Sequence, residues 1–134
     1  MIFLTQSDFD AAIKAENLTQ ILDNNPTLLD AVVLAAVQEV QSYLKTKFDV
    51  AAIFSTVGEA RNSQIVMYCV DIALYHIHAR VAPRQLPEAR LARYEQAIDW
   101  LKLVMRGSII PDLPLLQNDA TTSLQWGSQP QFRY

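Results

Sequence analysis

Residues 63–80 constrain the fold more than any other part of the sequence. A helix over this segment would carry apolar residues around nearly its whole circumference: Ile65, Val66, Cys69, Val70, Ile72, Ala73 and Ile77. A helix that is apolar on nearly every side is buried on more than one side. Asp71 and His76 interrupt its longest apolar run, which is shorter than the ~20 residues that cross a bilayer. We therefore predict a central core helix surrounded by other helices, and no membrane span.

A second long helix is predicted over residues 26–47, because Pro26 suits the first position of a helix. One stripe of apolar residues recurs at helical spacing: Leu29, Val33, Ala36, Val40 and Leu44. The first half of the segment is more apolar than this stripe requires. We therefore expect Val32, Leu34 and Ala35 to pack against another subunit, with burial in the chain's own core as the alternative.

Apart from a connector predicted over residues 49–58, the remainder of residues 1–107 is also predicted to be largely helical. A capping-box pattern that begins at Thr5 predicts a short helix through about Ala15, and a further helical turn follows it. A last long helix is predicted over about residues 87–106, closed by Gly107. Its apolar stripe consists of Leu91, Tyr94, Ile98, Leu101 and Met105. With only 3 glycines in 134 residues, we predict an all-α fold, a small bundle of about four helices.

Residues 108–134 are predicted to form an extended C-terminal tail, because prolines and polar runs replace the helical periodicity. Two short segments around Gly127 and Ser128 can form a β-hairpin. Aromatic residues in a tail without a core of its own should dock on the chain's own bundle, a neighbouring subunit or another protein. The residues expected to dock are Trp126, Phe132, Arg133 and Tyr134.

The sequence contains no recognisable catalytic, cofactor-binding or metal-binding motif, and we do not expect an enzyme. His76 and His78 lie about 200° apart around a helix, whereas a metal pair needs a spacing of three or four residues. Cys69 is the single cysteine and should be an inert core thiol. Asp71 lies in the most apolar helix, so we expect a buried ion pair there. Its candidate partners are Arg61, Arg80 and the arginines of the last helix.

Charge is distributed unevenly along the chain, although the net charge is only −3. Residues 1–30 carry a charge of −4 and residues 80–106 a charge of +3. Pairing of these segments within one molecule is the simpler interpretation. The alternative is a heterologous, ring-forming contact in which the acidic face of one subunit meets the basic face of the next.

The order of these features resembles the Mu-like phage family of head–tail connector proteins. The resemblance is carried by Tyr43-Leu44-Lys45-Thr46-Lys47-Phe48, by Val70-Asp71-Ile72-Ala73-Leu74-Tyr75, by Arg93-Tyr94-Glu95-Gln96-Ala97-Ile98-Asp99-Trp100-Leu101 followed by Gly107, and by Trp126-Gly127-Ser128-Gln129-Pro130. It covers nearly the whole chain. Residues 49–62 and 108–125 are longer than this resemblance leads us to expect.

The resemblance implies a structural subunit, without a cofactor, that forms a homo-oligomeric ring between portal and tail around the DNA channel. Its partners would be the portal and tail-completion proteins, with non-specific proximity to DNA in the channel. Its location would be the virion, and the host cytoplasm before assembly. The alternative is a small helical DNA-associated or regulatory module of a mobile element, with Arg84, Arg90 and Arg93 as its contact patch. The acidic sequence pI of about 5.2 argues against dedicated DNA recognition.

Overall fold

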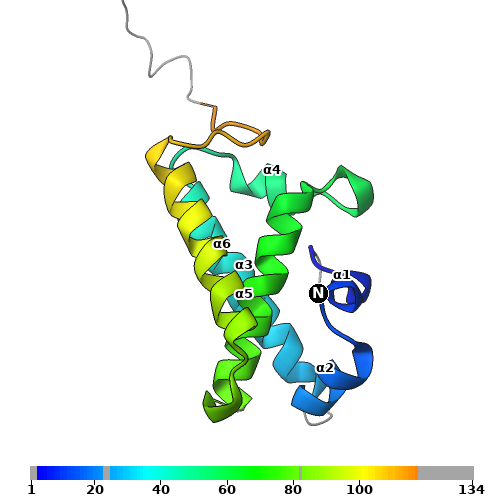
Figure 1. The fold of residues 1–134 in the computed structure, drawn as a ribbon. Helices are drawn as coiled ribbons and strands as arrows, with labels where there is room; N and C mark the ends of the chain where they lie inside the picture. The colour runs from blue at the N-terminus through cyan, green and yellow to red at the C-terminus, as the bar shows by residue number, and fades with distance from the viewer. Residues whose placement is uncertain (1–2, 23–24, 82, 118–134) are drawn as a thin grey trace, which may run out of the picture.

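The computed structural model describes residues 3–22, 25–81 and 83–117, which form six α-helices and two short 3-10 helices (Figure 1). The elements are α1 (Gln6–Ala12), α2 (Ala15–Leu22), α3 (Pro26–Leu44), α4 (Val50–Phe54), η1 (Gly58–Ala60), α5 (Ser63–Val81), η2 (Pro83–Gln85) and α6 (Glu88–Arg106). Within these ranges the only β-type pairing is an isolated bridge between Phe48 and Leu115. The all-α prediction is therefore confirmed for this part of the chain. There are more helices than the four expected, because the further helical turn predicted after α1 is a helix of its own, α2, and part of the predicted connector forms α4.

Helix α5 is the centre of the fold, as its apolar circumference predicts. It packs against α3 and α6, with which it forms a three-helix bundle, and against α1 and α2 (Figure 1). Asn62 caps its start, because the side-chain Oδ1 accepts a hydrogen bond from the backbone N–H of Ile65 at 3.1 Å. Ten of its residues are buried. No helix in the described part of the chain is long and apolar enough to cross a membrane.

Helix α3 buries the stripe that its sequence predicts. Leu29, Val33, Ala36, Val40 and Leu44 are each at most 6% exposed. The helix ends at Leu44 instead of continuing to about residue 47, and Lys45 caps it. Helical periodicity alone was sufficient to predict these buried residues, because one side of α3 faces the bundle.

The predicted stripe of α6 is wrong in part. Leu101 is fully buried, but Leu91 is 39% and Met105 is 40% exposed. The side that faces α5 is instead made by Ala97, Trp100, Leu101 and Val104. Trp100 packs its ring 4.9 Å from that of Tyr68 on α5. Helix α6 ends as predicted at Gly107, whose φ of 85° is the left-handed conformation that glycine tolerates best.

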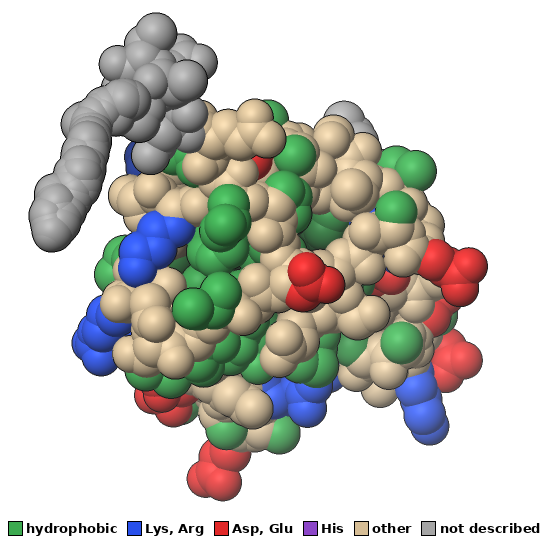
Figure 2. Space-filling model, turned by 90° about the horizontal axis from the view of Figure 1, so that it is seen from above, with side chains coloured by type: hydrophobic (Ala, Val, Ile, Leu, Met, Phe, Trp, Pro, Cys, Tyr) green, Lys and Arg blue, Asp and Glu red, His purple; other side chains and the backbone are tan. Residues whose placement is uncertain are grey.

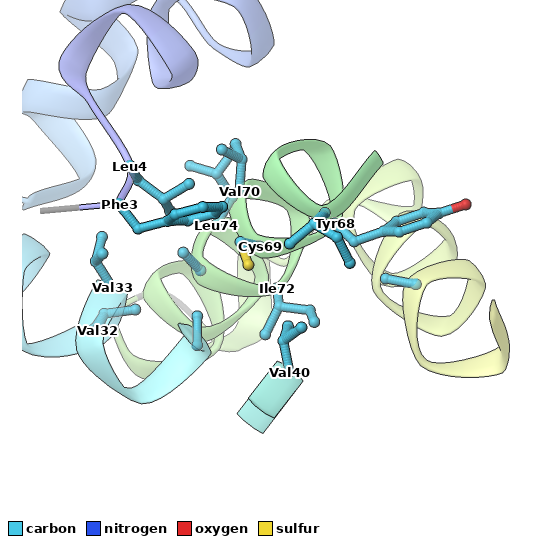
Figure 3. Packing of buried hydrophobic residues seen from close by; sticks show 14 of the residues in the cluster. Phe3, Leu4, Val32, Val33, Val40, Tyr68, Cys69, Val70, Ile72 and Leu74 are labelled. Carbon is cyan, nitrogen blue, oxygen red and sulfur yellow. The ribbon is translucent and has the colours of Figure 1, made fainter. Parts of the chain in front are cut away.

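The N-terminal segment is part of the same core. Phe3, Leu4 and Phe9 are buried in one cluster with residues of α3 and α5, among them Val70 (Figure 3). The Phe3 ring lies 4.7 Å from that of Phe54 on α4. Burial of three large side chains fixes α1 against α5 and thereby places one wall of the surface groove described below.

Residues 108–117, the first part of the predicted tail, fold back onto the bundle. The backbone N–H of Leu116 donates to the carbonyl of Lys47, and that of Asp49 donates to Pro114, both at 2.9 Å. Leu113 is 9% exposed and belongs to the core. The predicted β-hairpin and the residues expected to dock lie outside the described residues: Trp126, Phe132, Arg133 and Tyr134.

Candidate assembly surfaces

One side of α3 faces away from the bundle, and its charge is that of Asp30, which is exposed one turn before Leu34. Leu34 is 59% exposed, and Ala31, Ala35 and Gln38, which lie within one turn of it, are exposed as well. We call these four residues the α3 outer face. Val32 belongs to the other side of the helix: at 4% exposed it fills the chain's own core (Figure 3). Of the three residues expected at a subunit interface, only Leu34 and Ala35 are therefore available to a neighbour.

Asp71 on α5 forms the ion pair that its apolar surroundings require. Its side chain is 4% exposed, and Arg93 on α6 donates from Nε to Oδ1 at 2.9 Å. The partner is thus an arginine of the last helix. The neighbouring Tyr68 has its pKa raised by burial and, to a smaller extent, by the charge of Asp71. The pair links α5 to α6 across an otherwise apolar contact.

A groove of about 710 Å³ runs over α5 between α1 and α6. Val66, Met67 and Val70 of α5 are the apolar residues of its lining, together with Ala11 and Ala12 of α1. We call it the α5 groove. Four of its charged residues form two ion pairs, Asp71–Arg93 and Asp8–Arg61, the latter at 2.6 Å. The groove therefore combines apolar surface with two ion pairs and with Glu59, for which no ion pair is seen among the described residues.

A second hollow of about 610 Å³ adjoins the α5 groove through Ala11, Ala12 and Arg93, which line both. Arg90 of α6 crosses between the walls here and donates from Nη2 to the carbonyl oxygen of Ala12 at 2.9 Å. His78 lines this hollow, is 8% exposed, and its Nε2 has no hydrogen-bond partner among the described residues. Burial, and secondarily the charge of Arg90, lowers the pKa of His78. The buried Nε2 is thus a polar atom without a hydrogen bond within the described part of the chain.

The opposite side of α5 carries a polar cluster that joins all three long helices. His76 donates from Nε2 to Glu39 Oε1 on α3 at 2.8 Å, and Tyr94 on α6 donates to Glu39 Oε2 at 3.2 Å. Tyr75 stacks on Tyr94 with ring centroids 4.0 Å apart. Burial, followed by Glu39, raises the pKa of Tyr94 to about 12. The two histidines therefore point to different sides of α5, and this cluster serves to hold the bundle together.

The end of the bundle near α4 is a third exposed apolar surface. Val57 is 66%, Ile110 80%, Leu115 63% and Leu116 46% exposed. Figure 2 views the molecule from this end and shows hydrophobic side chains gathered on it. Exposed apolar patches of this kind are typical of contact sites with other proteins.

The arginines proposed as a DNA-contact patch are only partly available. Arg90 is bound to Ala12 and Arg93 to Asp71, so both have structural roles. Arg84 in η2 is exposed. The basic segment thus contributes two of its cations to internal contacts, which weakens the case for a continuous patch that would bind phosphates.

Chemically reactive groups are sparse in the described part of the chain. Cys69 is fully buried, and burial raises the pKa of its thiol far above the ordinary value. Within residues 3–22, 25–81 and 83–117, no three side chains of His, Cys, Asp or Glu gather where they could hold a metal ion.

A sequence model of the family described as Bacteriophage Mu, Gp36 matches residues 3–127. The chain belongs to this family. The match spans all six helices and extends beyond residue 117 into the predicted tail. No curated protein and no solved structure matched the chain. The family match therefore shows that the chain is a Mu-like phage protein, and it confirms that part of the sequence resemblance.

Proposed function

We propose that this chain is a structural head–tail connector subunit of a Mu-like phage, which forms a ring between portal and tail around the DNA channel. The observation that carries the proposal is the family match over residues 3–127, which makes the chain a Mu-like phage protein and favours a part in phage structure or morphogenesis. The surfaces of the fold support the same role. A small domain with an exposed helix face around Leu34, a groove and an apolar end is suited to several simultaneous protein contacts.

In this proposal the chain has no catalytic role and uses no cofactor. It acts by shape: copies pack side by side through the bundle, and the apolar end near α4 contacts the portal or a tail-completion protein. Residues Trp126, Phe132, Arg133 and Tyr134 dock on one of these neighbours in this proposal. The net charge of −3 suits a channel lining along which DNA slides without being held. The subunit would work in the virion and wait in the host cytoplasm before assembly.

Light scattering combined with electron microscopy tests the proposal, with the purified chain measured alone and with the portal protein of the same phage. We expect closed rings on the portal, whether or not the free chain is monomeric, because a portal can act as the template. A chain that never assembles on a portal would rule out the connector role. Tight, salt-sensitive binding to a short DNA duplex would favour the DNA-associated module instead.

A further inference from the structure

Residues 108–117 bring the chain back to the start of the α5 groove. The side chain of Asn62, which directly precedes α5, donates from Nδ2 to the carbonyl oxygen of Asp112 at 3.4 Å. A hollow of about 250 Å³ at this contact is lined by Leu113 and Arg61 among others, and Arg61 also lines the α5 groove. The hollow and the groove therefore adjoin. The segment lies at the end of the bundle where α5, and the groove over it, begin (Figure 1).

Residues 118–134, which follow the described part of the chain, are long enough to reach every part of this groove. An extended chain advances up to ~3.3–3.6 Å per residue, so about 15 residues reach about 50 Å. Helix α5 has 19 residues and is therefore only about 28 Å long. A tethered segment is also present near its own site at an effective concentration of about millimolar, whereas a neighbour's segment is present only at its bulk concentration. Both points favour the chain's own segment as the occupant.

One carboxylate in the lining of the α5 groove has no cation beside it. Glu59 in η1 is exposed and forms no ion pair among the described residues, whereas the other four charged residues of the lining are paired with one another. Val66, Met67 and Val70 of α5 supply apolar surface next to it, and Met67 is 38% exposed. An apolar occupant displaces water from this surface, and a cation within the occupant can pair with Glu59 while the existing pairs stay intact. The groove therefore suits a segment with large apolar side chains and one positive charge.

Residues 118–134 contain this combination. Arg133 is their only lysine or arginine, and Phe132 and Tyr134 flank it. Aromatic side chains bury a large area in a contact. In an extended segment, alternate side chains point to opposite sides. Phe132 and Tyr134 can therefore face the apolar lining while Arg133 points to the exposed Glu59.

We propose that, in the free chain, residues 118–134 dock in the α5 groove of the same molecule. Phe132 lies against Met67 in this contact, and Arg133 pairs with Glu59. The inference goes beyond the connector role, because it concerns the chain before assembly. The aromatic residues that dock on a neighbour in the assembled particle must first leave the groove. The contact thus holds them away from other molecules until that neighbour displaces them.

Cysteine cross-linking of the free chain tests the contact. Ser63→Cys, in the lining of the groove, is combined with Gln131→Cys and treated with a short bismaleimide at low protein concentration, while the buried Cys69 stays unreactive. The matched control pairs Gln131→Cys with Ser42→Cys, because Ser42 is also an exposed serine and lies in the last turn of α3, at the same end of the bundle. We expect the Ser63 pair to cross-link within one molecule at least about tenfold faster than the control pair.

Three results would overturn the inference. Equal rates for the Ser63 and Ser42 pairs would show that the segment does not prefer the groove. Fastest cross-linking to Ser108→Cys would place the segment on the apolar end near α4 instead. An equal mixture of ¹⁴N- and ¹⁵N-labelled Ser63 double variant should give cross-linked peptides of one isotope; mixed-isotope peptides as the main product would indicate the groove of a second copy.

These measurements need no portal, so their outcome is separate from that of the proposed function. Rings on the portal without the cross-link in the free chain would leave the connector role intact and remove this contact. The cross-link without rings on the portal would do the reverse.

A charge exchange tests the pairing of Arg133 with Glu59. In the Ser63 double variant, Glu59→Arg and Arg133→Glu should each slow the cross-link about two- to fivefold, and the two changes together should restore the rate. Glu16→Arg is the control, because Glu16 is exposed on α2 outside the groove, and it should leave the rate unchanged. The thermal midpoint checks that the fold is intact in every variant. Equal rates in all variants, or no recovery when both charges are exchanged, contradict the pairing.

Discussion

Replacement of Arg93 by methionine tests how the buried carboxylate of Asp71 is stabilised. The side chain of Asp71 is 4% exposed, and its Oδ1 accepts a 2.9 Å hydrogen bond from Arg93 Nε. Methionine keeps an unbranched apolar stem over the same part of α5 and removes the guanidinium. The carboxylate then remains inside the bundle without its cation, which is the costly way to break such a pair.

The size of the effect follows from the burial of the two partners. Unit charges about 4 Å apart interact by about 4 kcal/mol at an effective dielectric constant of 20. Removing one partner of a fully buried pair costs about 3–5 kcal/mol. The side chain of Arg93 is 50% exposed, so solvent already screens part of its charge. We therefore expect Arg93→Met to lower the free energy of unfolding by about 2–3 kcal/mol, less than the fully buried case.

Urea denaturation followed by circular dichroism at pH 7 measures this change. With a slope of about 1–3 kcal/mol per molar urea, the midpoint should fall by roughly 1–2 M. Arg84→Met is the control, because Arg84 is exposed in η2, and it should stay within about 0.5 kcal/mol of wild type. The double variant Asp71→Leu/Arg93→Met should recover stability relative to Arg93→Met alone. If Arg93→Met is no less stable than Arg84→Met, the ion pair does not hold Asp71 in the core.

Three further predictions concern local features of the bundle. Gly107→Ala should lower the free energy of unfolding by about 1–2 kcal/mol, since φ is 85° and the new Cβ would lie 2.9 Å from Lys47 Nζ. Gly58→Ala should cost less, because φ is 60° there and no atom lies within 4 Å of the new Cβ. The same urea titration compares the two variants. Cys69 should resist a thiol reagent at pH 8 in the native chain and react fully in urea; rapid native reaction would show that its burial is incomplete. Asp8 has its pKa lowered, chiefly by its hydrogen bond with Arg61, so its contribution to stability is present above the unfolded-state pKa and is lost as pH falls through the folded-state pKa. Asp8→Asn should therefore be less stable than wild type at pH 7, by about 1–2 kcal/mol, and the gap should close at acid pH; a gap that is independent of pH contradicts this assignment.

The sequence predicts a helix well where the spacing of its apolar residues fits only one buried side, or where it is apolar on nearly every side. Residues 63–80 are apolar on every side, and they form the central helix. The stripe of α3 from Leu29 to Leu44 is buried in full, because its residues recur at helical spacing along the whole helix. The need of Asp71 for a cation followed from its surroundings, although the choice of Arg93 among several arginines did not.

The side that a helix turns toward the core, and the point at which a helix breaks, depend on tertiary contacts. The sequence therefore predicted them less well. Both sides of α6 carry apolar residues, so the sequence could not decide that Trp100 would face α5 and Leu91 would remain exposed. The break between α1 and α2 has no glycine or proline to mark it. Ile13 is extended there, at φ −150°, which lets Leu18 of α2 reach the core.

The α5 groove was missed because no single segment encodes it. It exists since α1 packs on α5 and leaves a space before α6, and that depends on how three segments distant in sequence are placed. From the sequence, His78 was considered only together with His76, as a metal pair with an unsuitable spacing. The one available signal was its position in the same helix as Met67 and Asp71, at spacings that place all three on one side.

The connector role is tested most directly by the mass of the complex that the chain forms with the portal of its own phage, measured by native mass spectrometry at saturating chain. We predict one discrete mass increase that corresponds to many copies of the 15.1 kDa chain per portal. The Leu34→Glu variant should not give this increase. A portal that binds no chain, or a single copy, would contradict it.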